Sequence, residues 1–280
     1  DWMASSRICT YIVIGPLLLA LFIWEQFHSS KPYVSLKPLF QWKAILGYFY
    51  MMLIMFFSTS TTLLTSYLTT ILKVDNTHSY TLYIWLLPGY IVGAIICFWW
   101  FRWQRWRFRF LIAGGMACFA FFFGSMYFTV SPDSTYEMLF FPLFMRGLGM
   151  LTLIIAFALF AVEDLPPKYL LSNAFFLITF RSVLTPVMAS AFYSNVLYRL
   201  QQKYMVQLSE NITLTDPLSA SRYTSALTEN LQHGYGINEA TQLATNTMNS
   251  ILQQQATLLA LKHMLGWLFF ITLVIAIVSR

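Results

Sequence analysis

The fold of this chain is decided by one stretch, residues 138–186, which reads MLFFPLFMRGLGMLTLIIAFALFAVEDLPPKYLLSNAFFLITFRSVLTP. It contains an apolar run over Met138–Val162, a polar turn over Glu163–Lys168, and then a second apolar run. Each run carries one arginine well inside it, Arg146 in the first and Arg181 in the second. A charged side chain at the centre of a bilayer costs roughly 2.5–3.5 kcal/mol on insertion scales, so such residues face a bundle interior or a watery cavity. The hairpin therefore predicts a membrane protein with a polar interior.

The composition of the whole chain agrees with this interpretation. Of its 280 residues, 58% are hydrophobic and only 10% are charged, with a mean hydropathy of +0.61. A soluble domain is typically about 25% charged, so we expect an all-α polytopic membrane protein. The net charge of +6 then reflects the topology of the loops and not nucleic-acid binding. Cys9, Cys97 and Cys118 lack metal-ligand spacing and are interpreted as small packing residues.

A helix that spans a membrane needs about 20 apolar residues, and seven runs of this chain qualify. They are Cys9–Phe27, Ala44–Leu72, Tyr80–Phe101, Phe110–Val130, Tyr136–Val162, Tyr169–Leu197 and Leu258–Ser279. The polar segment Tyr198–Thr257 has apolar residues at helical spacing near both of its ends. We expect long helices that protrude from the membrane there, with turns at Asp216-Pro217 and Gly234–Gly236.

Basic residues predict which side of the membrane each loop occupies. The segment 102–109 holds four arginines in eight positions, including Arg102 and Arg105. The same side would carry Lys31, Lys37, Lys43, Lys168 and Arg280. We therefore expect this side to be cytoplasmic, with the beginning of the chain outside and its end in the cytoplasm. The flanking helices place the arginine-rich loop at the lipid head groups, which argues against a nucleic-acid partner.

The second run carries a stripe of hydroxyl groups. Ser58, Thr62, Thr65 and Thr69 are spaced by four, three and four residues, so they would share one helix face. The other half of the run contributes Tyr48, Met51, Met52 and Met55. One interpretation is that the hydroxyls bond to carbonyls of their own or a neighbouring helix. The other is a cavity wall, where hydroxyl, aromatic and adaptable methionine side chains meet varied ligands.

The two embedded arginines have different neighbours. Arg146 is followed by Gly147 and Gly149, which let a backbone or a ligand approach closely. It could pair with a carboxylate or carbonyl of the bundle or reach outward, or it could offer its charge to an anionic group or a proton-carrying carboxylate. The chain has no acidic residue at that depth. Arg181 precedes Pro186, which frees a carbonyl near residue 182 and allows a bend, so we expect a structural or gating role.

No pattern in the chain predicts an enzyme. It lacks a nucleophile–His–carboxylate set, a Gly-rich phosphate loop and a metal-ligand cluster, so we expect no catalytic residue, metal or cofactor. Seven helices also suggest a rhodopsin, which needs a lysine deep in its last helix. The only candidate, Lys262, lies at the outer end of that helix, which argues against a rhodopsin.

Several short motifs occur in a specific order. They are Phe144–Gly149, Leu165–Lys168, Leu171–Ala174, Phe180–Leu184 and, before the second run, Val34–Phe40. With the helix count and the long outer segment, they resemble the C-terminal part of a major facilitator superfamily transporter, of the fourteen-helix drug/proton antiporter family (EmrB/QacA type). The chain begins at Asp1 without Met or a signal peptide pattern, so we expect a fragment that lacks its N-terminal half. Of the superfamily's second Gly-x-x-x-Asp-x-x-Gly-Arg signature, only Gly93 and basic residues are present, without the Asp.

The resemblance implies a domain organisation. Residues 1–30 would be a linker transmembrane helix and 31–43 a cytoplasmic connection. Residues 44–280 would be the six-helix C-terminal domain, made of two inverted repeats, with 198–257 as an extended helical loop on the outer face. The cavity candidates are then Arg146, Ser58, Thr62, Met55, Tyr48 and Met51. The candidates for gating or domain contacts are Arg181, Pro186, Gly147, Gly149, Arg102 and Arg105.

The resemblance also implies a function, namely proton-coupled multidrug efflux by alternating access in a bacterial inner membrane. The partners would be membrane lipid, amphipathic drugs and the missing N-terminal half, with the proton gradient as the energy source and no cofactor. A second hypothesis is a membrane assembly module whose outer helices dock a periplasmic adaptor protein.

Overall fold

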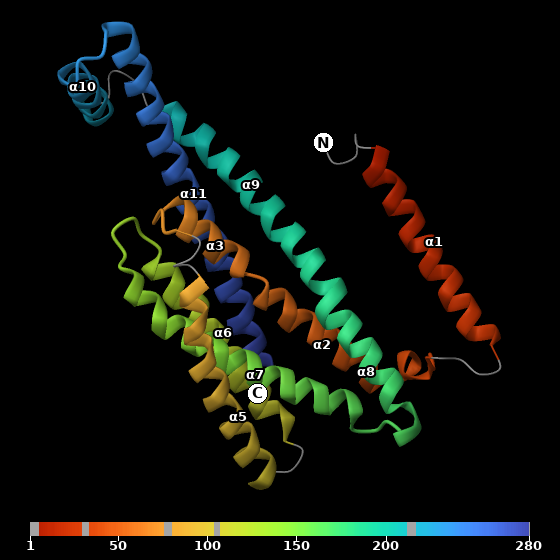
Figure 1. Cartoon of the computed structure of the whole chain (residues 1–280). Helices are drawn as coiled ribbons and strands as arrows, with labels where there is room; N and C mark the ends of the chain where they lie inside the picture. Colours follow the sequence, from red (N-terminus) through yellow and green to blue (C-terminus); the bar gives the residue numbers. More distant parts are fainter. Residues whose placement is uncertain (1–5, 30–33, 76–79, 104–106, 212–216, 280) are drawn as a thin grey trace. The chain divides into compact units, whose positions relative to one another are not determined.

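The computed structural model describes residues 6–29, 34–75, 80–103, 107–211 and 217–279 (Figure 1). Within these ranges the secondary structure is helical and includes no strand. The longer helices are α1 (Ser6–His28), α2 (Trp42–Ser58), α3 (Thr61–Thr70), α5 (Leu86–Trp103), α6 (Phe108–Thr129), α7 (Phe140–Val162), α8 (Leu170–Ile178), α9 (Thr185–Asn211), α10 (Pro217–Gln232) and α11 (Ile237–Val278). Short helical turns are η2 (Lys37–Phe40), η3 (Tyr83–Trp85), η4 (Tyr136–Leu139), η5 (Pro167–Tyr169) and η6 (Thr179–Leu184).

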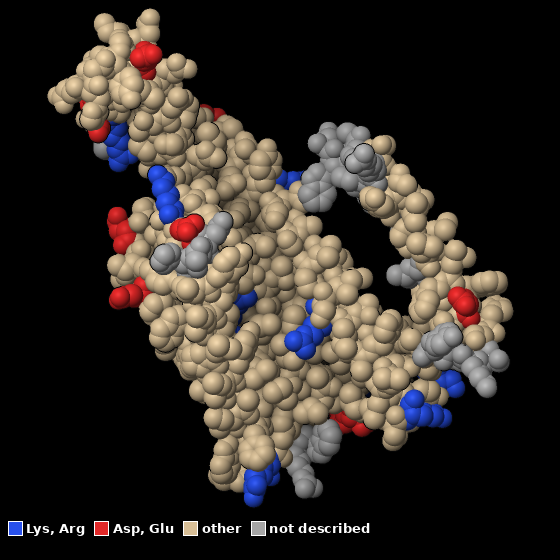
Figure 2. All heavy atoms as spheres, viewed as in Figure 1, with Lys and Arg blue, Asp and Glu red and all other residues tan. Residues whose placement is uncertain are grey.

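Among the described residues, six helical segments are long and apolar enough to cross a membrane. They are Trp42–Thr70, Tyr80–Trp103, Phe108–Thr129, Tyr136–Val162, Pro167–Glu210 and Ile237–Val278. The all-α membrane class is supported by these segments, and on the face drawn in Figure 2 acidic and basic residues are sparse. The first predicted span forms a helix, α1, but its described apolar part, Val13–His28, is shorter than the six segments. A count of seven spans therefore stays a prediction.

The structure divides into two compact units. Unit 1 comprises 1–53 and 157–184, and unit 2 comprises 54–156 and 185–280. In unit 1 the buried cluster contains Ala44, Tyr48, Leu165 and Phe176. Helix α2 can approach the end of α7 closely because Gly47 faces Ala161, and a Cβ at Gly47 would lie 2.5 Å from the Cβ of Ala161.

Unit 2 is organised around its last helix. α11 packs against α6 and α9, and α3 also contacts both α9 and α11. The core of unit 2 is rich in aromatic side chains such as Phe57, Phe119 and Phe123, whose ring centroids lie 6.2–6.4 Å apart. Large interlocking rings bury much apolar area per residue, and these three hold α2 against α6.

Long helices also form the predicted outer segment. α9 continues to Asn211, and α11 starts at Ile237, so it has 42 residues and is about 63 Å long at 1.5 Å per residue. A bilayer core is about 30 Å thick, so α11 is about twice as long as such a core is thick. Figure 1 shows α9 and α11 side by side, with α10 at their tip. The long helices predicted for this segment are thus present, and their protrusion from a membrane stays a prediction.

Two turns were predicted in that segment. Gly234 has a φ of +87°, which glycine adopts without steric cost, and its N–H bonds to the Leu231 carbonyl at 3.0 Å. This confirms the turn between α10 and α11. Asp216 of the other predicted turn lies outside the described residues, and Pro217 is the first residue of α10.

The predicted span over Ala44–Leu72 corresponds to the segment Trp42–Thr70, but its helix is interrupted and not continuous as expected. Helix α2 ends at Ser58 and α3 starts at Thr61. The segment before Pro186 is also irregular, because η6 is a π-helix over Thr179–Leu184. Proline has no N–H to give to the carbonyl four residues before it, which agrees with the irregularity expected near residue 182.

Candidate functional site

Five consecutive hydroxyl residues, Ser58–Thr62, occupy the break between α2 and α3. Ser and Thr side chains compete with backbone N–H groups for nearby carbonyls. The Thr59 hydroxyl donates to the Met55 carbonyl at 2.8 Å, and the Thr62 hydroxyl donates to the Thr59 carbonyl at 3.2 Å. Local side-chain chemistry therefore permits a break here, although the run contains neither proline nor glycine.

The break changes the backbone hydrogen bonds around it. The N–H groups of Ser60 and Thr62 bond to carbonyls three residues back, at 3.2 and 3.1 Å, in place of the helical four. The carbonyls of Phe56 and Ser58 thereby lose their helical partners. The Tyr193 hydroxyl on α9 donates to the Phe56 carbonyl at 3.1 Å. One of the two free carbonyls is thus satisfied by a side chain from another helix.

Arg146 on α7 satisfies the other free carbonyl. Its Nη2 donates to the Ser58 carbonyl, and its guanidinium lies 5.4 Å from the centroid of the Phe122 ring, within cation–π range. The side chain is only 2% exposed. Its Nε and Nη1 have no hydrogen-bond partner among the described residues, and neither has the buried Ser60 hydroxyl.

The surroundings of Arg146 contain dipoles and rings but no opposite charge. Among the described residues the ion pairs all involve Lys43, so Arg146 is in none. Tyr83, Tyr90 and Tyr193 are the titratable residues near it. Arginine stays protonated in proteins and has donors only. The site is therefore a buried positive charge with unused donors.

A methionine sulfur lies beside this charge. Met150, one helical turn after Arg146, accepts the Ser58 hydroxyl at 3.3 Å and the Tyr90 hydroxyl at 3.2 Å through its Sδ. Thioether sulfur is a weak acceptor, so both hydroxyls can exchange this bond for a better acceptor at little cost.

The hydroxyl stripe differs from its prediction. Because of the break, Ser58 belongs to α2 whereas Thr62, Thr65 and Thr69 lie on α3 or at its start, so the four do not share one continuous helix face. Thr65 and Thr69 donate to carbonyls of their own helix at 3.0 and 2.9 Å. The first of the two interpretations, bonding within the bundle, accounts for the described contacts.

The remaining cavity candidates are buried. Met51 and Met55 are 0% and 7% exposed. Tyr48 donates to the Asn173 side-chain oxygen and stacks on Phe180 with ring centroids 5.4 Å apart, within unit 1. Arg146, Met55 and the helix break belong to unit 2.

Gly147 and Gly149 let α7 approach two different helices. A Cβ at Gly147 would lie 2.5 Å from the Leu86 carbonyl oxygen of α5. A Cβ at Gly149 would lie 2.8 Å from the Gly115 carbonyl oxygen of α6. The expected close approach is confirmed and is made by backbones, which hold α7 between α5 and α6.

The structure describes three of the four other candidates for gating or domain contacts. Arg181 is half-buried in η6, and Pro186 is half-buried near the start of α9. Arg102 is exposed in the last turn of α5. Arg105 lies outside the described residues.

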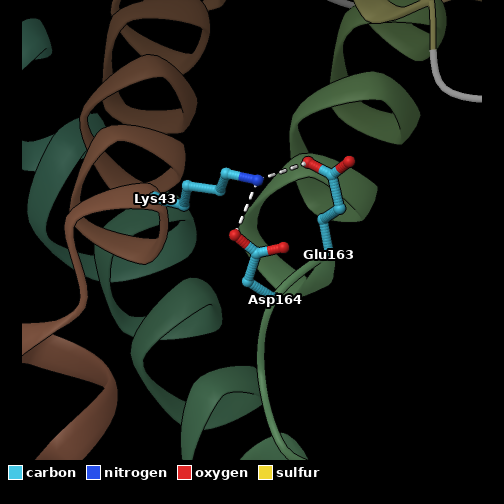
Figure 3. Close-up of polar contacts among 3 residues, drawn as sticks. All are labelled: Lys43, Glu163 and Asp164. Carbon is cyan, nitrogen blue, oxygen red and sulfur yellow. Dashed lines mark hydrogen bonds and ion pairs between the residues drawn. The ribbon is translucent and has the colours of Figure 1, made fainter.

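An ion-pair cluster in unit 1 was not predicted. Figure 3 shows Lys43, at the start of α2, reaching between Glu163 and Asp164 at the end of α7. Its Nζ lies 3.3 Å from Glu163 Oε2 and 2.6 Å from Asp164 Oδ2. The side chains are between 25% and 60% exposed, so solvent screens both pairs and their contribution to the stability of the fold is small. The cluster links two segments 120 residues apart in sequence.

Comparison with known proteins assigns no relative to the chain. No protein-family model matches it, and no curated protein matches it. Among the described residues, no group of three or more His, Cys, Asp or Glu side chains could hold a metal ion. The chemistry of the site therefore has to be inferred from its geometry.

Proposed function

We propose that this chain is part of a proton-coupled efflux transporter for amphipathic compounds, which resides in a bacterial inner membrane and works by alternating access. One observation carries the proposal. Arg146 is 2% exposed inside an apolar helix and keeps two nitrogens without a partner among the described residues. Ionisable residues inside membrane segments are costly and typically mark substrate paths, ion paths or proton relays.

The unused donors of Arg146 define the chemistry it can bind. A guanidinium offers N–H donors and no acceptor, so a carboxylate or another anionic group completes its bonds. Charge-assisted bonds of this kind are roughly twice as strong as neutral ones. An acidic side chain would bind Arg146 when ionised and release it when protonated, which couples the site to protons. The resemblance places such acidic residues in the N-terminal half.

The helix break next to Arg146 supports the same proposal. Non-helical backbone at membrane depth is tolerated where protein buries it or where it lines a cavity. Transporters place substrate and ion sites at such discontinuous helices. The Ser58 carbonyl and Arg146 supply an acceptor and a donor at this point. An amphipathic ligand that carries both kinds of group could replace their mutual bond.

The test is efflux of an amphipathic dye from cells that produce the complete polypeptide containing this chain, with and without a protonophore. We expect Arg146→Gln to slow efflux at least about tenfold, a barrier change of about 1.4 kcal/mol. Ser58→Ala keeps the backbone carbonyl and should have a smaller effect. Arg109→Gln, at an exposed arginine outside the site, is the matched control.

Two results contradict this proposal. The first is unchanged efflux of every tested compound in Arg146→Gln at normal expression. The second is wild-type efflux that persists when the protonophore has collapsed the proton gradient.

The second candidate is an assembly module that docks a periplasmic adaptor protein. The projection formed by α9, α10 and α11 favours it, because helices of this length extend well beyond a bilayer. Deletion of Ser209–Asn230 should abolish capture of the adaptor while dye efflux across the inner membrane continues. Capture that survives this deletion contradicts the assembly hypothesis.

A further inference from the structure

A groove of about 580 Å³ lies in unit 2 between α6 and α11. Gly124 on α6 and Gly266 on α11 line it. The Phe269 ring packs over Gly124, where a Cβ would lie 3.0 Å from it, whereas a Cβ at Gly266 would lie 3.6 Å from the Tyr127 ring. Aromatic residues form much of the remaining wall, including Phe128, which is 82% exposed, and Trp267, which is 63% exposed. The groove is therefore an apolar depression on the surface of this unit.

The position of the groove along the two helices matches one membrane leaflet. Phe128 lies one residue before the end of α6, and α11 turns from polar to apolar near Leu258, shortly before Lys262. From Lys262 to Phe270 the helix rises about 12 Å. Half of a bilayer core is about 15 Å. The groove thus extends from the level of the head groups into one leaflet when these helices cross a membrane.

Polar donors gather at the head-group end of the groove. Lys262 lines it and takes part in no ion pair among the described residues. His263 also lines it, and its Nδ1 lies 2.7 Å from the Tyr204 hydroxyl, which leaves Nε2 on the opposite side of the ring. The groove lining includes no carboxylate. The unpaired ammonium of Lys262 at the end of this apolar groove complements an anion that carries a hydrocarbon chain.

We propose that this groove binds one anionic phospholipid. Its phosphate lies at Lys262 and His263, and an acyl chain follows the aromatic wall toward Phe270. A zwitterionic lipid would bring a second cation beside Lys262, so the site selects a head group with net negative charge. This inference requires only that α6 and α11 span a membrane, and it does not depend on transport.

The test is native mass spectrometry of the purified protein in detergent, titrated with phosphatidylglycerol or phosphatidylcholine. We expect one phosphatidylglycerol to bind in clear preference to phosphatidylcholine. Lys262→Gln should weaken that binding about tenfold, because it removes a charge-assisted contact. Lys203→Gln, at an exposed lysine of α9, is the matched control and should bind as the wild type does.

Gly266→Leu tests the apolar part of the groove by filling it. We expect it to abolish binding while the thermal unfolding midpoint stays near that of the wild type. If this variant misfolds, Lys262→Gln alone decides the question. Equal binding of both lipids, an undiminished affinity in Lys262→Gln, or a dimer that forms through the groove in place of lipid binding would each overturn the proposal.

Discussion

Gly89→Ala is expected to separate α5 from α7 at the level of Arg146. A Cβ at Gly89 would lie 2.3 Å from the Phe144 carbonyl oxygen and 2.8 Å from the Leu148 nitrogen. Both atoms belong to the backbone of α7, so no side-chain rotation relieves the contact. Ordinary van der Waals contact begins near 3.4 Å, and the two helices must therefore move apart by about 1 Å, a gap that forfeits a quarter to a half of each affected contact.

The size of the effect follows from two opposing contributions. Alanine is favoured over glycine in a helix interior by about 1 kcal/mol. Overpacking of a rigid contact costs about 1–3 kcal/mol, and here the upper end applies because backbone meets backbone. We expect a net loss of about 1–2 kcal/mol in the free energy of unfolding, which lowers Tm by about 2–8 °C for a protein of this size.

The accessibility of two cysteine thiols gives a direct assay of thermal unfolding. Cys97 is 2% exposed on α5, and Cys118 is half-buried on α6. In a Cys9→Ser background, a thiol-reactive dye reports when these two thiols become accessible during heating in detergent. Gly89→Ala should bring that transition to lower temperature and speed labelling of Cys97 below the transition.

Gly114→Ala is the matched control, because a Cβ at Gly114 meets nothing within 4 Å. It has the same chemistry on a neighbouring helix, so its Tm should stay unchanged or rise by a few degrees. If both variants unfold at the same temperature, close backbone packing at Gly89 does not hold α5 against α7, and the reasoning is wrong.

Three further predictions concern other contacts. Tyr193→Phe should destabilise the protein by about 1–3 kcal/mol in thermal unfolding, because the Phe56 carbonyl is left unpaired, whereas Tyr198→Phe at an exposed tyrosine should not. Lys43→Glu should raise the unfolding rate slightly, and Glu163→Lys in the same chain should reverse part of that increase. If this double-mutant cycle shows no coupling, the ion pair does not contribute to stability. Ser225→Cys on exposed α10 should react with a membrane-impermeant maleimide added outside intact cells, and protection there would reverse the predicted orientation.

Much of the fold could be predicted from apolar run length alone. Six of the seven predicted spans correspond to segments long and apolar enough to cross a membrane. The turn at Gly234 and the close approach at Gly147 were also predictable, because glycine has a specific steric role at each. The extension of α9 past Leu197 to Asn211 was also predictable, because apolar residues recur there at helical spacing.

The break after Ser58 and the partners of Arg146 could not be predicted. A run of hydroxyl residues is compatible with a continuous helix as well as with a broken one, since both let the side chains bond to nearby carbonyls. The outcome depends on donors from elsewhere, and Tyr193 lies 137 residues from the Phe56 carbonyl it serves. Tyr193 is one of 16 tyrosines in an aromatic-rich chain, and nothing local distinguishes it.

The break between α2 and α3 involves no proline. A proline there would remove a donor permanently and clash with the preceding turn. Ser60 and Thr62 retain their N–H groups, so the chain keeps the donors that an unbroken helix needs at these two positions. An unbroken helix would pair the Thr62 N–H with the Ser58 carbonyl, which Arg146 Nη2 bonds in this structure. The backbone donors here therefore suit either a broken or a continuous helix.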